Sequence, residues 1–210
     1  MATESMQNKA TDLFSDWAEI GRDKGMADAH DPAVSEILDK ILKNQKTSFT
    51  FIDAGCGNGW VVRKVRSLPN CSTAIGVDGA RAMIDNARNI DPNGEYYFDD
   101  LLTWTPDQKA DIIHSMEVFY YFKDPQHLTD QIVNNWLKPN GKLVIGLDHY
   151  IGNPDSYSWS KDLNVHMSLL SEQEWLDIFL HSGLSNCVSW KANVTDDFPG
   201  TLVISGVLLG

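Results

Sequence analysis

The stretch Ser48-Phe-Thr-Phe-Ile-Asp-Ala-Gly-Cys-Gly-Asn-Gly-Trp60 decides the fold. Its first half, SFTFIDA, has the aromatic and β-branched content of a buried strand, and closely spaced glycines follow at once. Glycines let the backbone turn sharply at the end of a strand and approach a ligand without a Cβ atom. The helix expected from Trp60 would present free N–H groups at its N-terminus. Together these features predict a nucleotide-like ligand across the carboxyl end of the strand.

Beyond this stretch the sequence alternates between short strand and helix patterns, with short connections. Such alternation predicts a mostly parallel sheet with helices on both faces. Ser171 followed by Glu174 is a capping box that starts a late helix, and two further strands follow that helix. The predicted elements are strands 48–54, 72–78, 95–98, 110–116, 141–148, 186–192 and 201–209 and helices 60–67, 80–89, 125–137 and 171–182.

Two amphipathic helices are expected before the first strand. Residues 11–20 and 32–42 both carry apolar side chains at helical spacing. Asp31 before Pro32 is typical of an N-cap followed by proline in the first turn, which predicts that the second helix begins there.

Length, composition and charge narrow the class of protein. The 210 residues suit one domain, and no apolar run approaches the length of a membrane span. The N-terminus lacks the pattern of a secretory signal, so a cytoplasmic location is expected. A net charge of −12 disfavours a nucleic-acid partner. The three cysteines form no CxxC pair and no histidine cluster has metal-ligand spacing, so we expect no metal.

Acidic residues mark the ends of the next two predicted strands. Asp78 ends the second strand, about one βαβ repeat after Asp53, where a carboxylate can accept hydrogen bonds from ribose hydroxyls. Asp99 and Asp100 end the third strand, where Asp100 could accept from an adenine amino group and Leu101 could cover the ring. Alone, each would be read as a surface turn; their order and spacing favour a binding site.

These motifs resemble those of the class I S-adenosylmethionine-dependent methyltransferase family. The resemblance rests on FIDAGCGNGW, GVDGA, FDDLLTW, ADIIHSMEVFYYFKDP and LKPNGKLVIG, which occur in the family's order over residues 49–148. It implies a Rossmann-like α/β fold with a seven-stranded, mostly parallel sheet whose last strand is antiparallel. It also implies one domain over residues 1–210, comprising an N-terminal helical lid (1–45), a cofactor-binding core (46–150) and a substrate insert with C-terminal strands (151–210).

The resemblance also implies the cofactor, S-adenosyl-L-methionine, with S-adenosyl-L-homocysteine as product. Residues of the first motif would surround the methionine part, Asp78 would bind ribose, and Asp100 with Leu101 would bind adenine. The dinucleotide fingerprint G-x-G-x-x-G is absent, because Trp60 occupies the position of its third glycine. Its absence argues against a nicotinamide cofactor. The predicted cofactor-binding residues are Asp53, Gly55, Cys56, Gly57, Asp78, Gly79, Asp99, Asp100, Leu101, Ser115 and Met116.

Residues after the fourth and fifth strands are candidates for the methyl acceptor site. His149 is the candidate general base because a histidine titrates near neutral pH, although a packed histidine is an equally good interpretation. Tyr120 and Tyr121 complete the candidate catalytic set, against the alternative that they are core aromatics. All three are expected to face the cofactor's methyl group across one enclosed pocket. The candidate substrate-binding residues are Trp17, Glu117, Tyr150, Trp159 and His166.

The function predicted from these features is methyl transfer to an oxygen or nitrogen atom of a small molecule. A [DNS]-P-P-[YFW] motif would indicate methylation of amino groups in DNA, but residues 115–118 read SMEV. The alternatives are a protein methyltransferase and a non-catalytic scaffold that binds the cofactor. The acceptor and the oligomeric state are not indicated by any motif.

Overall fold

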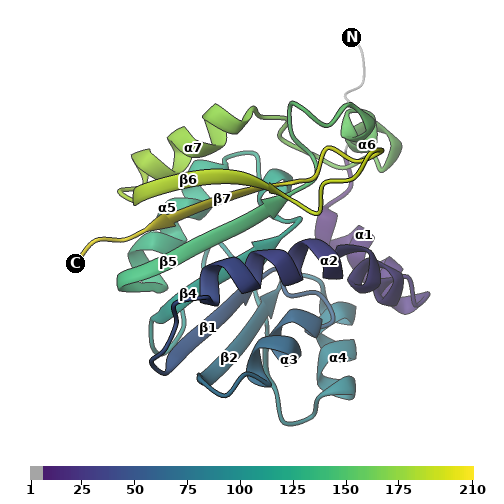
Figure 1. Ribbon diagram of the computed structural model, residues 1–210. Coiled ribbons are helices and arrows are strands. Elements are labelled where there is room, and N and C mark those ends of the chain that lie inside the picture. The colour runs from purple at the N-terminus through teal and green to yellow at the C-terminus, as the bar shows by residue number, and fades with distance from the viewer. Residues whose placement is uncertain (1–6) are drawn as a thin grey trace.

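The computed structural model describes residues 7–210 as helices packed around one seven-stranded sheet (Figure 1). The targeting prediction rests partly on residues 1–6, which lie outside the described residues. Among residues 7–210, no helix is both long and apolar enough to cross a membrane. The elements in chain order are α1 (Ala10–Glu19), α2 (Asp23–Leu42), β1 (Phe49–Ala54), α3 (Trp60–Arg66), β2 (Cys71–Asp78), α4 (Arg81–Ile90), β3 (Glu95–Phe98), β4 (Ala110–Met116), η1 (Phe119–Tyr121), α5 (Pro125–Asn135), β5 (Leu137–Leu147), η2 (Pro154–Ser156), α6 (Trp159–Asp162), α7 (Glu172–His181), β6 (Ser185–Ala192) and β7 (Thr201–Val207).

The strand order is β3-β2-β1-β4-β5-β7-β6. The first five strands in this order run parallel, whereas β7 is antiparallel to both β5 and β6. β1 lies at the centre of the parallel part, with Ile52 opposite both Ile75 and Ile113. This topology confirms the predicted Rossmann-like sheet with its antiparallel last strand. It also brings the carboxyl ends of β1, β2, β3, β4 and β5 to one edge, where ligands bind in such sheets.

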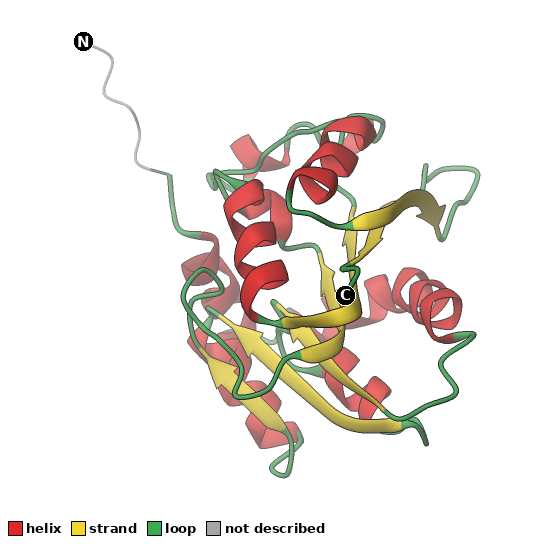
Figure 2. Cartoon of the chain, turned by 90° about the vertical axis from the view of Figure 1, so that its left-hand side faces the viewer, coloured by secondary structure: helices red, strands yellow, loops and turns green. Residues whose placement is uncertain are grey.

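Helices cover both faces of the sheet (Figures 1 and 2). On one face, buried apolar residues of α2, α3 and α4, including Ile37, Val62 and Ile84, pack against β1 and β2. On the other face, α5 and α7 bury Ile132 and Trp175 over β4, β5 and β7. Both faces of the central strands are therefore apolar, as expected for a parallel sheet.

The second helix begins earlier than the sequence predicts. α2 runs from Asp23 to Leu42 with Pro32 in its interior, so the predicted start at Asp31 is wrong. Pro32 has no backbone N–H, so the helix loses one main-chain hydrogen bond there, but the fixed φ angle of proline is compatible with a helix. The Asp31 carboxylate does not cap the helix; it accepts a hydrogen bond from Lys64 of α3 at 2.5 Å. Packing of the stripe that includes Val34 and Ile37 stabilises the helix through the proline.

The helix predicted over 125–137 ends at Asn135, and Leu137 already begins β5, so that boundary is wrong. The local signals around α7 are confirmed. Ser171 caps α7, with its hydroxyl accepting from the Glu174 N–H while the Glu174 carboxylate accepts from the Ser171 N–H. The two predicted strands after α7 are β6 and β7.

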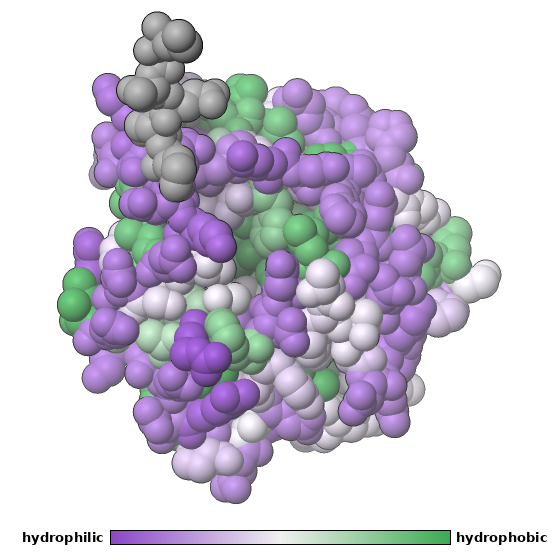
Figure 3. All heavy atoms as spheres, turned by 180° about the vertical axis from the view of Figure 1, so that it is seen from behind, coloured by the Kyte–Doolittle hydropathy of each residue, from purple (hydrophilic) through white to green (hydrophobic). Residues whose placement is uncertain are grey.

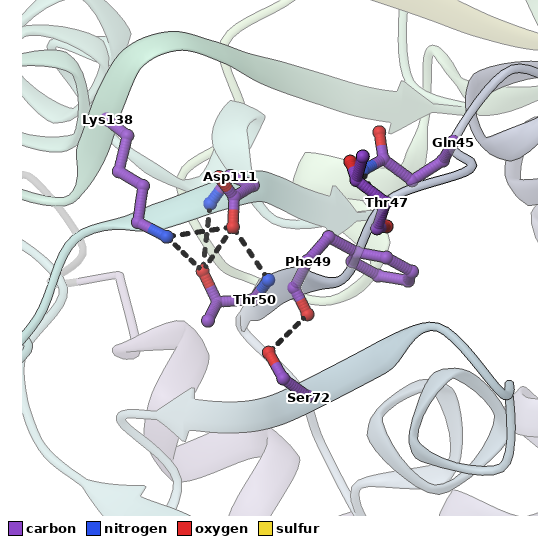
Figure 4. A network of polar contacts seen from close by, with 7 residues as sticks. All are labelled: Gln45, Thr47, Phe49, Thr50, Ser72, Asp111 and Lys138. Carbon is purple, nitrogen blue, oxygen red and sulfur yellow. Dashed lines mark hydrogen bonds and ion pairs between the residues drawn. The ribbon is translucent and has the colours of Figure 1, made fainter.

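A polar network joins the amino ends of three strands, on the opposite side of the sheet from the ligand-binding edge (Figure 4). Asp111 of β4 accepts hydrogen bonds from the Thr50 N–H and hydroxyl of β1, both at 2.8 Å, and from Lys138 of β5 at 2.8 Å. These contacts link β1, β4 and β5 where the strands begin.

Candidate active site

Gly55 and Gly57 of the glycine loop after β1 both have positive φ angles, but their surroundings differ. Gly55 has φ of +78°, and a Cβ atom there would lie 2.3 Å from Val118 Cγ2. Gly57 has φ of +53°, but a Cβ atom would meet only Met83 Sδ, at 3.9 Å. Gly55 is therefore packed against protein, whereas Gly57 borders open space. That space is where the loop can approach a ligand.

Asp78 holds the glycine loop against the end of β2. Its carboxylate accepts hydrogen bonds from the Gly57 N–H at 2.8 Å and the Ala80 N–H at 2.7 Å. Burial raises the pKa of Asp78 to about 6, the negative charge of Asp53 adds to this, and the two N–H groups oppose it. The carboxylate lines the cavity and retains acceptor capacity for ligand hydroxyls, which fits the ribose role.

Asp53 and Ser115 fix the ends of neighbouring strands. The buried Asp53 carboxylate is hydrogen-bonded to His114 Nδ1 of β4 at 2.7 Å. The Ser115 hydroxyl donates to the Ala54 carbonyl at 2.6 Å, so it is used within the sheet. Asp53 lines the cavity and Ser115 does not.

The loop after β3 forms the third side of the site. Asp99 and Asp100 are exposed and line the cavity, and Leu101 is buried beside them. Asp100 Oδ1 accepts from the Leu102 N–H at 2.9 Å, which shapes the turn. The aspartate carboxylates and the Leu101 side chain therefore stand together where the resemblance implies adenine.

One cavity of about 1840 Å³ spans the carboxyl ends of β1 to β4 and is closed on one side by α1 and α2. Ligand pockets commonly measure about 300–1000 Å³, so this cavity has room for a cofactor and a second molecule. Apolar side chains gather in a hollow near the middle of the face shown in Figure 3, within a largely hydrophilic surface. The predicted site residues that line the cavity are Trp17, Asp53, Gly55, Cys56, Gly57, Asp78, Gly79, Asp99, Asp100, Leu101, Met116, Glu117, Tyr120, Tyr121, Trp159 and His166.

Glu117 occupies the other end of the cavity, directly after β4. Its backbone has φ of +61°, an unfavourable conformation for a residue with a side chain and one that recurs at functional sites. Its carboxylate accepts from the Tyr120 hydroxyl at 2.6 Å and from the Asp148 N–H. Burial, with the charge of Asp148, raises the pKa of Glu117 well above its usual value.

A series of contacting aromatic rings that line the cavity begins at Tyr120, the hydrogen-bond partner of Glu117. The Tyr120 and Tyr121 ring centroids are 4.6 Å apart, and Phe14 of α1 meets Tyr121 edge to face at 5.3 Å. Trp17 stands beside Phe14 at 5.4 Å. We call these four rings, Phe14, Trp17, Tyr120 and Tyr121, the aromatic box. Two of its members come from α1, so the N-terminal helices complete this end of the cavity.

His149 lies behind Tyr120 rather than in the cavity lining. Its Nδ1–H donates to the Ser156 carbonyl at 3.0 Å, and its Nε2 is buried with no partner among residues 7–210. Burial lowers the pKa of His149, with the Ser156 carbonyl acting in the opposite direction. Tyr150 is also outside the lining, with its hydroxyl donating to the Gly200 carbonyl at 2.9 Å. The structure thus brings Tyr120 and Tyr121 to the cavity but not His149.

Residues from α2 reach the site without having been predicted to do so. Asp23 and His30 line the cavity, and Asn58 of the glycine loop joins them. His30 Nε2 is 3.9 Å from the Asp148 carboxylate, which follows β5. The sequence offers little signal for Asp23 and His30, because its pattern predicts a second helix that begins only at Pro32.

His30, Glu117 and Asp148 are the one group within residues 7–210 whose ligand atoms, all within 4.8 Å of one another, could hold a metal ion. Both Glu117 oxygens and Asp148 Oδ1 already accept hydrogen bonds from protein groups. The prediction that no metal binds stays a prediction.

Comparison with known families decides the class of protein. A family model described as a methyltransferase domain matches residues 26–188. The chain belongs to this methyltransferase family. This match confirms the predicted class I, S-adenosylmethionine-dependent methyltransferase family.

Curated relatives of this methyltransferase domain act on small molecules or a carrier protein. The chain is 29% identical over 158 residues to malonyl-[acyl-carrier protein] O-methyltransferase of Halalkalibacterium halodurans, covering 67% of this chain and 58% of the relative. It is 26% identical over 132 residues to trans-aconitate 2-methyltransferase of Agrobacterium fabrum, covering 63% and 48%. The chain therefore spans about half the length of these curated relatives.

Solved structures extend the match over the whole chain. A methyltransferase solved in complex with the Haloferax volcanii Trm112 methyltransferase activator superposes with a TM-score of 0.82 at 26% identity, covering 99% of this chain and 100% of that one. The N-methyltransferase NodS of Bradyrhizobium japonicum WM9, solved with S-adenosyl-L-homocysteine, has a TM-score of 0.64 at 18% identity, covering 83% and 84%. At this sequence identity, the likeness to NodS shows that the two proteins share a fold.

Proposed function

We propose that this chain binds S-adenosylmethionine and transfers its methyl group to an oxygen or nitrogen atom of a small molecule. The observation that carries the proposal is one cavity with two chemically different ends. Carboxylates and the glycine loop line one end, and Glu117 with the aromatic box lines the other. The cofactor, when bound, supplies a methyl group on a sulfonium that an aligned nucleophile displaces.

The residues at the cofactor end suit a cation that carries hydroxyl groups. Asp78 accepts from ribose, and Asp99 and Asp100 lie beside the adenine position. The open side of Gly57 leaves room for the methionine part. The charges of Asp53 and Asp78 favour a positively charged ligand over a pyrophosphate. The cofactor role of these residues follows from the family, and their arrangement supports it.

The residues at the acceptor end can align a nucleophile and take its proton. An apolar, aromatic enclosure excludes water and restricts the orientation of a bound molecule. Glu117 touches this space, and its raised pKa makes it a stronger base than an exposed glutamate. We assign the proton-accepting role to the Glu117 carboxylate, in place of the His149 role expected from the sequence. The proton reaches Glu117 directly or through Tyr120, whose hydroxyl passes its own proton to Glu117 as it takes the proton of the acceptor.

A labelled methyl group tests this proposal against its alternatives. The purified chain is incubated with S-adenosylmethionine carrying a radioactive methyl group and a cell extract, which is then separated into small molecules, protein and nucleic acid. Label in the small-molecule fraction is the expected result. Label in protein would favour the protein methyltransferase. S-adenosylhomocysteine binding in calorimetry, with no label transferred to any fraction, would favour the non-catalytic scaffold.

A protein partner is a second candidate property. The Haloferax volcanii likeness covers both chains almost completely, and that methyltransferase was solved with an activator protein. We propose that this chain also associates with an activator of the Trm112 kind. Coexpression with Haloferax volcanii Trm112, followed by size-exclusion chromatography, should give a 1:1 complex with increased S-adenosylhomocysteine affinity. Separate elution of the two proteins would contradict the association and leave the catalytic proposal standing.

A further inference from the structure

Asp23 and Asn58 leave two buried oxygens without hydrogen-bond partners. Asp23 is the first residue of α2, and Asn58 belongs to the glycine loop; their side chains meet through a 2.9 Å hydrogen bond from Asn58 Nδ2 to Asp23 Oδ2. The residues are only 4% and 5% exposed. Asp23 Oδ1 and Asn58 Oδ1 nevertheless have no partner among residues 7–210. Buried polar atoms in folded proteins rarely lack a hydrogen-bond partner. The two oxygens therefore indicate a ligand that donates hydrogen bonds to them.

The surroundings of these oxygens favour a cationic donor. Both residues line the cavity, and the carboxylates of Asp53 and Asp78 line it beside the same loop. Two arginines that neighbour these residues use their guanidinium groups in other contacts. Arg63 donates to the Asn58 main-chain carbonyl at 2.6 Å, and Arg22 stacks over Trp17 with its Cζ 4.6 Å from the ring centroid. Among residues 7–210, Asp23 therefore forms no ion pair, and its negative charge lies in a residue that lines the cavity.

We propose that Asp23 Oδ1 and Asn58 Oδ1 bind the α-ammonium group of the cofactor's amino-acid part, an inference that rests on the proposed function. An ammonium group offers three N–H donors and a full positive charge, so it satisfies both oxygens at once. The position agrees, because Asn58 lies between Gly57 and Gly59, in the motif that the family resemblance assigns to the methionine part. Asp23 and Asn58 thus select ligands that carry the amine.

The link also joins the N-terminal helices to the glycine loop. Asp23 stands at the beginning of α2, and Asn86 of α4 makes a longer 3.5 Å contact with the same carboxylate. A bound ammonium group would tie α2, α4 and the loop around one charge. The N-terminal helices are therefore positioned by the cofactor as well as by their apolar packing.

Three ligands separate recognition of the amine from other contacts. S-adenosylhomocysteine carries the amine and carboxylate, S-adenosyl-3-thiopropylamine keeps only the amine, and 5′-methylthioadenosine lacks both. Calorimetry measures each Kd for the parent chain, Asp23→Asn and Asn58→Ala. We expect Asp23→Asn to weaken the first two ligands by about 10- to 100-fold and to leave 5′-methylthioadenosine within about twofold. Asn58→Ala should give a smaller loss with the same ligand pattern.

Asp28→Asn is the matched control, because it removes the same charge from an exposed position of the same helix. It should leave all three affinities unchanged. Equal weakening of all three ligands in Asp23→Asn would overturn the inference and assign Asp23 to the nucleoside or to loop structure. If Asp23→Asn loses its thermal unfolding transition, the ligand pattern of Asn58→Ala decides. No S-adenosylhomocysteine binding by the parent chain would overturn both this inference and the proposed function, whereas binding unaffected by either substitution would overturn the inference alone.

Discussion

At the residue scale, the protonation of Asp78 should control cofactor binding. Only the ionised carboxylate accepts hydrogen bonds on all its lone pairs, and its pKa of about 6 lies above the ordinary value of 3.8 because the group is buried. The affinity for S-adenosylhomocysteine should therefore increase as pH rises from 5 to 7 and level off above. Asp78→Ala should bind S-adenosylhomocysteine about 1.5–3 kcal/mol more weakly than the parent chain at pH 7.5. Calorimetry across this pH range checks both statements. If the affinity of Asp78→Ala still rises between pH 5 and 7, the pH dependence belongs to another group.

Glu117 is the residue whose replacement should separate chemistry from cofactor binding. Gln keeps an oxygen that can accept from the Asp148 N–H but cannot take a proton from the acceptor. Glu117→Gln should lower turnover by roughly 10²–10⁴-fold with S-adenosylhomocysteine affinity unchanged. The measurement is methyl transfer to the labelled small-molecule fraction. His149→Ala is the comparison variant, and a greater loss of turnover in that variant would return the base role to His149.

At the element scale, α7 depends on its capping box. The Ser171 hydroxyl satisfies the Glu174 N–H, and α7 buries Trp175 and Phe179 against the sheet. Ser171→Ala leaves that N–H without its partner and should lower the free energy of unfolding by about 1 kcal/mol. Urea denaturation measures the change. Ser171→Thr, which keeps a capping hydroxyl, is the control, and equal losses in the two variants would show that the cap contributes nothing specific.

At the scale of the whole molecule, the hydrogen-bond network around Asp111 should make the free energy of unfolding depend on pH. Burial alone would raise the pKa of Asp111, but hydrogen bonds from Lys138 and Thr50 outweigh it and lower the pKa below its ordinary value. The stability from a lowered pKa is present above the unfolded-state pKa near 3.8 and is lost as pH falls through the lower folded-state value.

Asp111→Asn should therefore lower the free energy of unfolding by about 0.5–1 kcal/mol at pH 7, a modest value because the ion pair is more than a third exposed. The difference from the parent chain should vanish towards pH 2. Denaturant titrations at several pH values measure it. A difference that persists undiminished at pH 2 would assign the effect to packing rather than charge.

The sequence by itself determined the order of the main elements and indicated which residues lie together at the proposed cofactor end of the cavity. Strand patterns, the glycine loop, Asp78 and the Ser171 cap all depend on residues close together in the chain, and each predicted its own local structure. Parallel pairing then brings successive strand ends to one edge, so residues predicted from separate motifs meet there. The Gly55 and Asp78 positions could be found in this way because backbone sterics and strand ends constrain them.

Only the tertiary structure decided the acceptor end and the helices that enclose it. His149 and Glu117 both follow central strands, yet backbone geometry aims Glu117 into the cavity and buries His149 behind Tyr120. Asp23 meets Asn58 because α2 begins well before Pro32 and continues through it. Such contacts depend on how whole helices pack, and a packed apolar stripe outweighs a local start signal at one residue. Local sequence patterns specify which elements form, whereas the packing of those elements specifies which side chains share the cavity.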